Sequence, residues 1–118
     1  QVAQRFETQE PAPVEVPLSD LQSFDTARKW IGMLVVVKDV TVQGAPAATD
    51  ANGRVAASVG SAGPSINNEL WDLQAWSGTN TSNSFAAGTH FKSITGIVDF
   101  FFNVFVAPRS MDDLVQGP

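Results

Sequence analysis

The clearest alternation of side chains in the chain runs from His90 to Phe101, where successive residues fall on two faces with the period of a β-strand. Phe102–Asn103 is the predicted turn, because asparagine tolerates the left-handed conformation that tight hairpins need. Val104–Ala107 supplies the returning strand, and Pro108 ends it because proline cannot donate to a ladder. The pattern predicts a β-hairpin with a defined stop.

A second β-rich segment spans Trp30 to Gln43 and is the longest in the chain. Its apolar residues occupy both faces: Met33, Val35 and Val37 on one, and Leu34, Val36, Val40 and Val42 on the other. A strand buried on both faces belongs in a barrel or a sandwich. A bend at Gly32 or at Lys38–Asp39 would let it serve two sheets.

Turn signals divide the middle of the chain. Asp50–Gly53 is a strong turn, and Arg54–Val59 follows as the next strand. Ile66–Leu73 is predicted to form a third strand or a short helix, and Ser77–Ser84 is a polar loop. These segments place further short strands between the two longer β-regions.

The N-terminal residues differ in composition from the rest. Residues 1–17 hold three prolines and several glutamines and glutamates, which indicates an extended lead-in or linker. Residues 18–118 then form one β-domain. Ser19–Leu21 and Thr26–Lys29 are expected to form short helical turns before the first strand, and Ser110 caps a third turn after Pro108.

A long bent first strand, a strand after a D-x-N-G turn, an irregular middle and a final hairpin make the plan of an OB-fold. Gly32–Val42, GMLVVVKDVTV, resembles the first strand of OB-like domains of secreted bacterial proteins, including those ahead of extracellular endonuclease/exonuclease/phosphatase domains. Gly88–Leu114 resembles the last part of such domains through Thr95–Val98 and Pro108–Ser110. Two departures are Asn103 at the hairpin turn, where the group favours glycine, and phenylalanines where it has tyrosines.

This resemblance implies an all-β fold, namely a five-stranded OB-like Greek-key barrel with short helical turns and an extended N-terminal segment. It also implies an accessory domain, because the catalytic residues of that group lie outside these 118 residues.

Composition narrows the classes of function. The net charge of −5 comes from 7 basic and 12 acidic residues with no basic cluster, which disfavours nucleic acid because phosphates are bound by lysine and arginine. The absence of cysteine removes disulfides, thiolate nucleophiles and cysteine metal sites together. No apolar run reaches the ~18 residues of a membrane span, so no membrane insertion is expected. A neutral, lysine-poor surface favours an extracellular or periplasmic location. A chain that opens at Gln1 suggests either a mature product after signal removal or an excised domain.

The titratable residues give no coherent catalytic or metal set. His90 is the single histidine, and neither a triad nor a zinc site can be assembled around it without cysteine or a second histidine, so a solvated side chain is expected. Asp50 opens a segment like a calcium loop, but Ser61 stands at the twelfth position where a glutamate is needed. Asp20 and Asp112–Asp113 begin helical turns, where carboxylates cap free N–H groups. Neither an enzyme, a metal nor a cofactor is predicted.

Aromatic residues supply the candidate contact sites. Trp71 and Trp76, beside the polar loop, could stack on sugars or bases, or could instead close the ends of the barrel. The row Phe100, Phe101, Phe102 and Phe105 must expose at least one set of rings, because alternation puts its members on opposite faces. Arg109 could hold a phosphate or carboxylate, or pair internally with Asp112 or Asp113.

The leading prediction is a noncatalytic exported β-barrel module that acts through protein contacts, with a partner protein or with further copies of itself. One alternative is an accessory ligand-binding domain for single-stranded nucleic acid or a glycan. Another is an extracellular filament subunit in which Val2–Val16 donates a strand to its neighbour.

Overall fold

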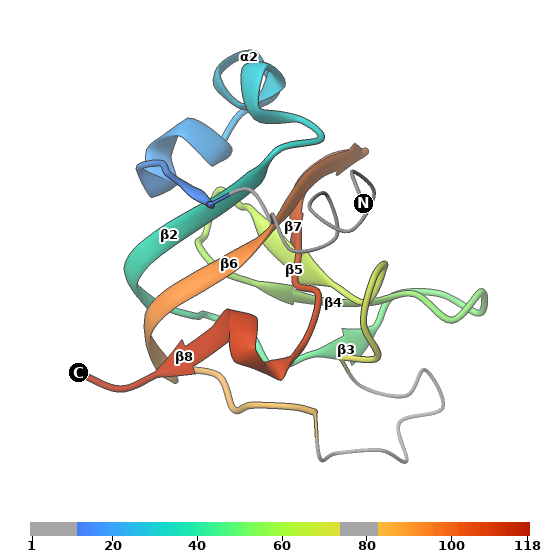
Figure 1. Cartoon of the computed structure of the whole chain (residues 1–118). Helices are drawn as coiled ribbons and strands as arrows, with labels where there is room; N and C mark the ends of the chain where they lie inside the picture. The colour runs from blue at the N-terminus through green and yellow to red at the C-terminus, as the bar shows by residue number, and fades with distance from the viewer. Residues whose placement is uncertain (1–11, 74–82) are drawn as a thin grey trace, which may run out of the picture.

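The computed structural model describes residues 12–73 and 83–118 and consists mainly of β-strands with a few short helical turns (Figure 1). The strands are β1 (Val14–Glu15), β2 (Leu34–Thr41), β3 (Ala47–Ala48), β4 (Val55–Ser58), β5 (Ser65–Asn67), β6 (His90–Phe101), β7 (Asn103–Ala107) and β8 (Leu114–Gln116). The helical turns are η1 (Leu18–Leu21), α2 (Phe24–Ala27), η2 (Arg28–Trp30) and η3 (Met111–Asp113). The prediction of an all-β fold is confirmed.

All eight strands belong to one mixed sheet with the order β1-β2-β6-β7-β5-β4-β3, to which β8 is added along β6. The pairs β1–β2 and β5–β7 are parallel, and the other pairs are antiparallel. The path runs from β1 at one end to β3 at the other, so its ladders do not by themselves close the five-stranded barrel that the sequence predicts.

β2 is apolar on both faces because both of its faces are buried. Three consecutive residues, Val35, Val36 and Val37, are all buried, at 0%, 9% and 3% exposure. The backbone of β2 is also covered on both edges, by β6 and by β1. Asp39 has φ 59 and interrupts the pairing with β6, at the place where the sequence predicts a bend. The prediction that the strand starts at Trp30 is wrong, because Trp30 ends η2 and Gly32 then turns the chain with φ 84.

β6 is the longest strand, at 12 residues, and three strands pair with it. One edge pairs with β2 from Thr41 to Leu34; the other edge pairs first with β8 and then with β7. In Figure 1, β2 and β6 run side by side as long, curved ribbons. Gly96 lies at the crowded crossing with β7, where a Cβ would stand 2.6 Å from the carbonyl oxygen of Ala107. A larger residue would push β7 away from β6.

The hairpin turn differs from its prediction. Phe101 pairs with Asn103, which leaves Phe102 alone to reverse the chain, and Phe102 takes the left-handed conformation with φ 64. Asn103, the residue that the sequence assigns to that conformation, is the first residue of β7. The register between β6 and β7 therefore decides which residue turns.

The core gathers side chains from most of the chain. Its buried members include Val16, Leu21, Val35, Ile66, Leu73, Phe91, Ile94, Val98 and Val106. Val16 belongs to the predicted lead-in, yet it is 2% exposed and donates its backbone N–H to Val36 O at 3.1 Å. The described end of that lead-in is thus tied into the sheet.

His90 joins three segments at the start of β6. Its Nε2 contacts Asp39 Oδ1 at 2.6 Å, and its Nδ1 contacts the carbonyl oxygen of Gly117, just after β8. The carbonyl of Gly117 and then the carboxylate of Asp39 raise the pKa of His90, since each accepts a hydrogen bond from a ring nitrogen and so favours the protonated ring. The expectation of a merely solvated histidine therefore gives way to a hydrogen-bonded link between β2, β6 and the segment after β8.

This link predicts a pH dependence of stability. Because the folded pKa of His90 is raised, its stabilisation is fully present below the unfolded pKa and is lost as the pH rises through the folded value. Urea unfolding is expected to show a larger fall in stability from about pH 6 to pH 9 for the wild type than for His90→Gln. As a control, Asp39→Asn should lower the pKa of this single histidine in an NMR titration. An unshifted His90 pKa would contradict the link.

Candidate functional site

The tip of the β6–β7 hairpin exposes three successive aromatic side chains, which we call the phenylalanine turn: Phe100, Phe101 and Phe102. Their exposed fractions are 40%, 49% and 82%. Phe105 is half-buried on β7 between the buried residues Val104 and Val106. The hairpin runs beyond the end of the core, so the rings on both faces emerge at its tip.

Few contacts hold these rings. Phe100 packs against Phe24 of α2 at a centroid distance of 4.7 Å, and Phe101 meets Phe102 edge-on at 4.6 Å. The guanidinium carbon of Arg54 lies 4.7 Å from the centroid of Phe101, within the range of a cation–π contact. Phe24 is itself 44% exposed, so it extends the apolar surface of the turn.

Phe102 combines exposure with backbone strain. At φ 64 its Cβ crowds the backbone, which costs a residue with a side chain roughly 1–2 kcal/mol. Glycine and asparagine would take the same conformation at lower cost. A bulky apolar residue stands here although stability favours a small one, and such positions cluster at sites of contact.

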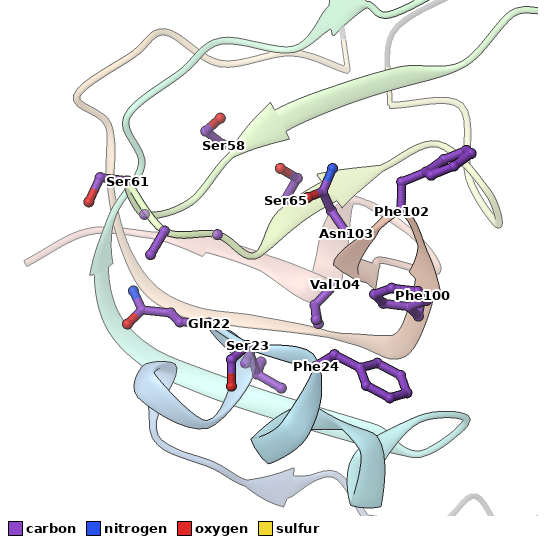
Figure 2. A pocket seen from close by; sticks show the side chains of 14 residues that line it. Gln22, Ser23, Phe24, Ser58, Ser61, Ser65, Phe100, Phe102, Asn103 and Val104 are labelled. Carbon is purple, nitrogen blue, oxygen red and sulfur yellow. The ribbon is translucent and has the colours of Figure 1, made fainter.

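A cleft of about 560 Å³, which we call the polar cleft, lies on one side of the turn. Figure 2 shows its lining: Gln22, Ser23 and Phe24 face Ser58, Ser61 and Ser65, with Phe100, Phe102, Asn103 and Val104 from the hairpin. Phe24 and Phe100 lie side by side at one end. None of the described residues that line this cleft carries a charge.

The other side of the turn faces a cleft of about 610 Å³, which we call the acidic cleft. Its walls are the loop Thr49–Arg54, parts of β4 and β5, and the hairpin from Asp99 to Phe105. The carboxylates of Asp50, Glu69 and Asp99 line it, against one cation, Arg54. The two clefts differ in charge although they share the same aromatic rim.

Local hydrogen bonds fix the walls of the acidic cleft. The side chain of Asn68 accepts from Val55 N at 3.0 Å and donates to Gly53 O at 2.9 Å, which ties the loop to β4. Arg54 Nε donates to Asp50 Oδ2 at 2.8 Å. The N–H of Asn52 and then the guanidinium of Arg54 hold the pKa of Asp50 below its usual range, so this carboxylate is ionised.

The predicted tryptophan site is only partly described. Trp71 is half-buried and packs against the core, which is the arrangement given above as the alternative to a binding role. Trp76 and most of the polar loop lie outside the described residues.

Arg109 pairs internally, as one of its two predicted roles requires. Its Nε donates to Asp113 Oδ2 at 3.0 Å and its Nη2 to Asp113 Oδ1 at 3.0 Å. The backbone N–H of Arg109 donates to the same Oδ2 at 2.8 Å. Asp113 is 6% exposed, so the pair fastens the turn between β7 and β8.

Several residues of the clefts were not singled out from the sequence. Phe24 looks like part of an ordinary helical turn, and Arg54, Glu69 and Asp99 are single charges far apart along the chain. A signal existed for Arg54 alone, since it directly follows the D-x-N-G turn.

Within residues 12–73 and 83–118, no three histidine, aspartate or glutamate side chains group as a metal site would need. In the same residues, no helix has the length and apolar character required to cross a bilayer.

Comparisons of this chain with protein-family models, with curated proteins and with solved structures found no match.

The strain at Phe102 predicts an unusual order of stability. Phe102→Gly and Phe102→Ala remove the same ring, but only alanine keeps a Cβ at φ 64. The glycine variant should therefore be more stable than the alanine variant by about 1 kcal/mol, measured by urea unfolding. Equal stability of the two variants would show that the turn carries no such strain.

The ion pair of Arg109 with Asp113 predicts that replacing Asp113 lowers the stability of the fold, whereas replacing the neighbouring Asp112 does not. Asp113→Ala leaves three N–H donors without their acceptor and should destabilise the chain by about 2 kcal/mol, less than a fully buried pair because Arg109 is 38% exposed. Asp112→Ala, at an exposed position of η3, should change stability by less than about 0.5 kcal/mol. Unfolding midpoints that coincide would contradict this role.

Proposed function

We propose that this chain is a noncatalytic binding module of an exported protein, and that it docks a partner protein over the phenylalanine turn. The observation that carries the proposal is Phe102, a large apolar side chain that is 82% exposed on a strained backbone. Together with Phe24, Phe100 and Phe101 it forms an apolar patch at one end of the molecule. Patches of this kind most often mark protein interfaces, where aromatic residues dominate the binding energy.

We also propose that the fold is an OB-like barrel. Its support is the parallel pairing of β5 with β7, together with the hydrogen bonds from Gln43 N and Gly44 N to Ser58 O at 3.0 and 3.2 Å. These bonds join the chain beyond β2 to the end of β4, across the gap that the ladders leave open. OB-folds bind ligands on the face of their second and third strands and on the adjoining loops. In this assignment β4 and β5 are those strands, and the acidic cleft lies beside them.

Charge argues against a nucleic-acid ligand. A single-stranded nucleic acid brings one phosphate per nucleotide, and its binding requires lysine and arginine along a groove. The acidic cleft offers three carboxylates and one arginine that already contacts Asp50, and the polar cleft offers no cation.

A glycan at the polar cleft is the second candidate. Its support is the uncharged hydrogen-bonding lining of Gln22, Ser58 and Ser65, with the rings of Phe24 and Phe100 at one end. Hydroxyl-rich ligands are bound by such combinations of ring faces and neutral polar groups.

Strand donation between subunits, the third function considered, requires β1 to leave its own β2. Val16 is part of the core and follows β1 directly, so release would also uncover the core. This makes donation the least favoured form of self-assembly.

The test of the proposed function compares three full-length chains: wild type, Phe101→Ser/Phe102→Ser, and the control Ile31→Ser/Met33→Ser. The control removes two exposed apolar side chains outside the turn, Ile31 at 38% and Met33 at 40% exposure. Each is measured by sedimentation velocity and by affinity capture from the extracellular medium of the producing cells. We expect self-association or one captured protein to survive in the control and to be lost in the turn variant, because the variant removes the docking rings. A monomer with the same captured proteins in all three chains would refute the proposal.

A further inference from the structure

We propose that the partner presents a basic segment, and that an arginine or lysine of this segment enters the acidic cleft between the phenylalanine rings and the carboxylates of Glu69 and Asp99. This inference rests on the proposed function, because it names the chemistry of the partner that docks at the phenylalanine turn.

The first support is the charge left over after the internal ion pairs are formed. Arg54 and Asp50 are joined at 2.8 Å and neutralise one another. Glu69 and Asp99 line the same cleft, and among the described residues neither forms an ion pair. The cleft therefore carries two uncompensated negative charges beside an apolar rim.

The confinement of this charge to one side of the turn is the second support. The polar cleft shares Phe100, Phe102 and Asn103 with the acidic cleft but has no charged side chain. A partner that covers the phenylalanine turn would thus meet apolar rings in the middle and negative charge on one flank only. Complementary charge on one flank fixes the orientation of the partner as well as its identity.

The aromatic wall already accommodates a guanidinium. Arg54 lies over Phe101 at 4.7 Å while its Nε donates to a carboxylate, so a ring face and an acid hold one arginine together. Phe102 offers a second, largely exposed ring, and Asp99 and Glu69 offer the acids. The contacts of Arg54 with a ring and a carboxylate thus show the geometry in which an arginine of the partner would bind.

Two contacts fix these residues before any partner binds: one holds the carboxylate of Asp99 and the other holds the backbone of Glu69. Asp99 Oδ1 accepts from Phe100 N at 2.8 Å, which holds this carboxylate next to the rings. The backbone N–H of Glu69 donates to Asn67 Oδ1 at 3.2 Å, and Asn67 is 8% exposed. The preorganised carboxylate of Asp99 loses less freedom when a cation arrives.

The occupant is a protein segment rather than a free cation, because the rim is apolar. Three exposed phenylalanines need apolar side chains on the partner to be covered, and a polyamine or a metal ion supplies none. The net charge of −5 draws a basic partner towards the chain from a distance.

The probe for the test is a fluorescein-labelled, capped peptide of alternating arginine and leucine, and its matched control has citrulline in place of arginine. Citrulline keeps the shape of arginine and lacks the charge. Binding is measured by fluorescence anisotropy at about 0.15 M salt, where long-range attraction is screened over roughly 8 Å.

The cleft variant is Glu69→Gln/Asp99→Asn, in which the side-chain oxygen that accepts from Phe100 N is retained. The matched control is Asp25→Asn/Asp112→Asn, which changes the net charge equally at two exposed positions outside the cleft. We expect the wild type and the control to bind the arginine peptide with affinities within about threefold of one another. The cleft variant should bind it at least about tenfold more weakly, and the citrulline peptide should bind weakly to every chain.

Equal weakening in the cleft variant and the control would overturn the inference, since it would show attraction to the overall charge. Equal binding of the citrulline peptide would also overturn it. Self-association that disappears in the cleft variant, without any peptide binding, would assign the cleft to a second copy of this chain instead. If the peptide results fail while Phe101→Ser/Phe102→Ser still loses its captured partner, the basic segment is refuted and the proposed function stands.

Discussion

The register of β6 against its three neighbours is the constraint on which the rest of the structure depends. Its pairing with β2 builds the core, because Val35 and Ile94 then point into the same interior. Its pairing with β7 fixes the last pair at Phe101 and Asn103 and so leaves one residue to reverse the chain. Gly96 permits the close approach of β7 in this register, since a side chain there would collide with the backbone of Ala107. A contact inside the sheet thus decides that a phenylalanine stands at the tip.

Periodicity along the chain was enough to predict β2, β6 and β7 but not the turn between β6 and β7, nor the short strands β1, β3 and β8. The valines of β2 and the alternation in β6 are local patterns, and burial on both faces follows from them directly. The positive φ of Phe102 arises instead from a register between two strands, so no local preference of asparagine could reveal it. Trp30 shows the same limit, because its aromatic character suits a strand while its position after α2 places it in a helical turn.

Only the part of the candidate site that is contiguous in sequence could be predicted. The phenylalanine row is contiguous in sequence, and alternation alone requires some of its rings to be exposed. The clefts beside it are assembled from residues far apart along the chain, such as Phe24 with Phe100 in the polar cleft and Arg54 with Asp99 in the acidic cleft. Only the fold brings Phe24 against Phe100, or Glu69 to the same cleft as Asp99. The chemistry of the rim was therefore visible in the sequence, whereas the charge of its flank was not.

The ion pairs of the described residues distinguish the acidic cleft from the rest of the surface. Within the described residues, Lys38 pairs with Glu15, Arg54 with Asp50, His90 with Asp39 and Arg109 with Asp113. Three of these pairs fasten segments: β1 to β2, the start of β6 to β2, and the turn before β8 to itself. The fourth, Arg54 with Asp50, stiffens the loop at the edge of the acidic cleft and places a guanidinium over Phe101. The carboxylates of Glu69 and Asp99 join no such segments. A negative charge beside exposed rings reduces the loss of solubility that the rings cause. It also favours a cationic partner in the proposed function. In the proposed function, the phenylalanines Phe24, Phe100, Phe101 and Phe102 suit any apolar partner, so specificity would come from the flank on which the charge lies.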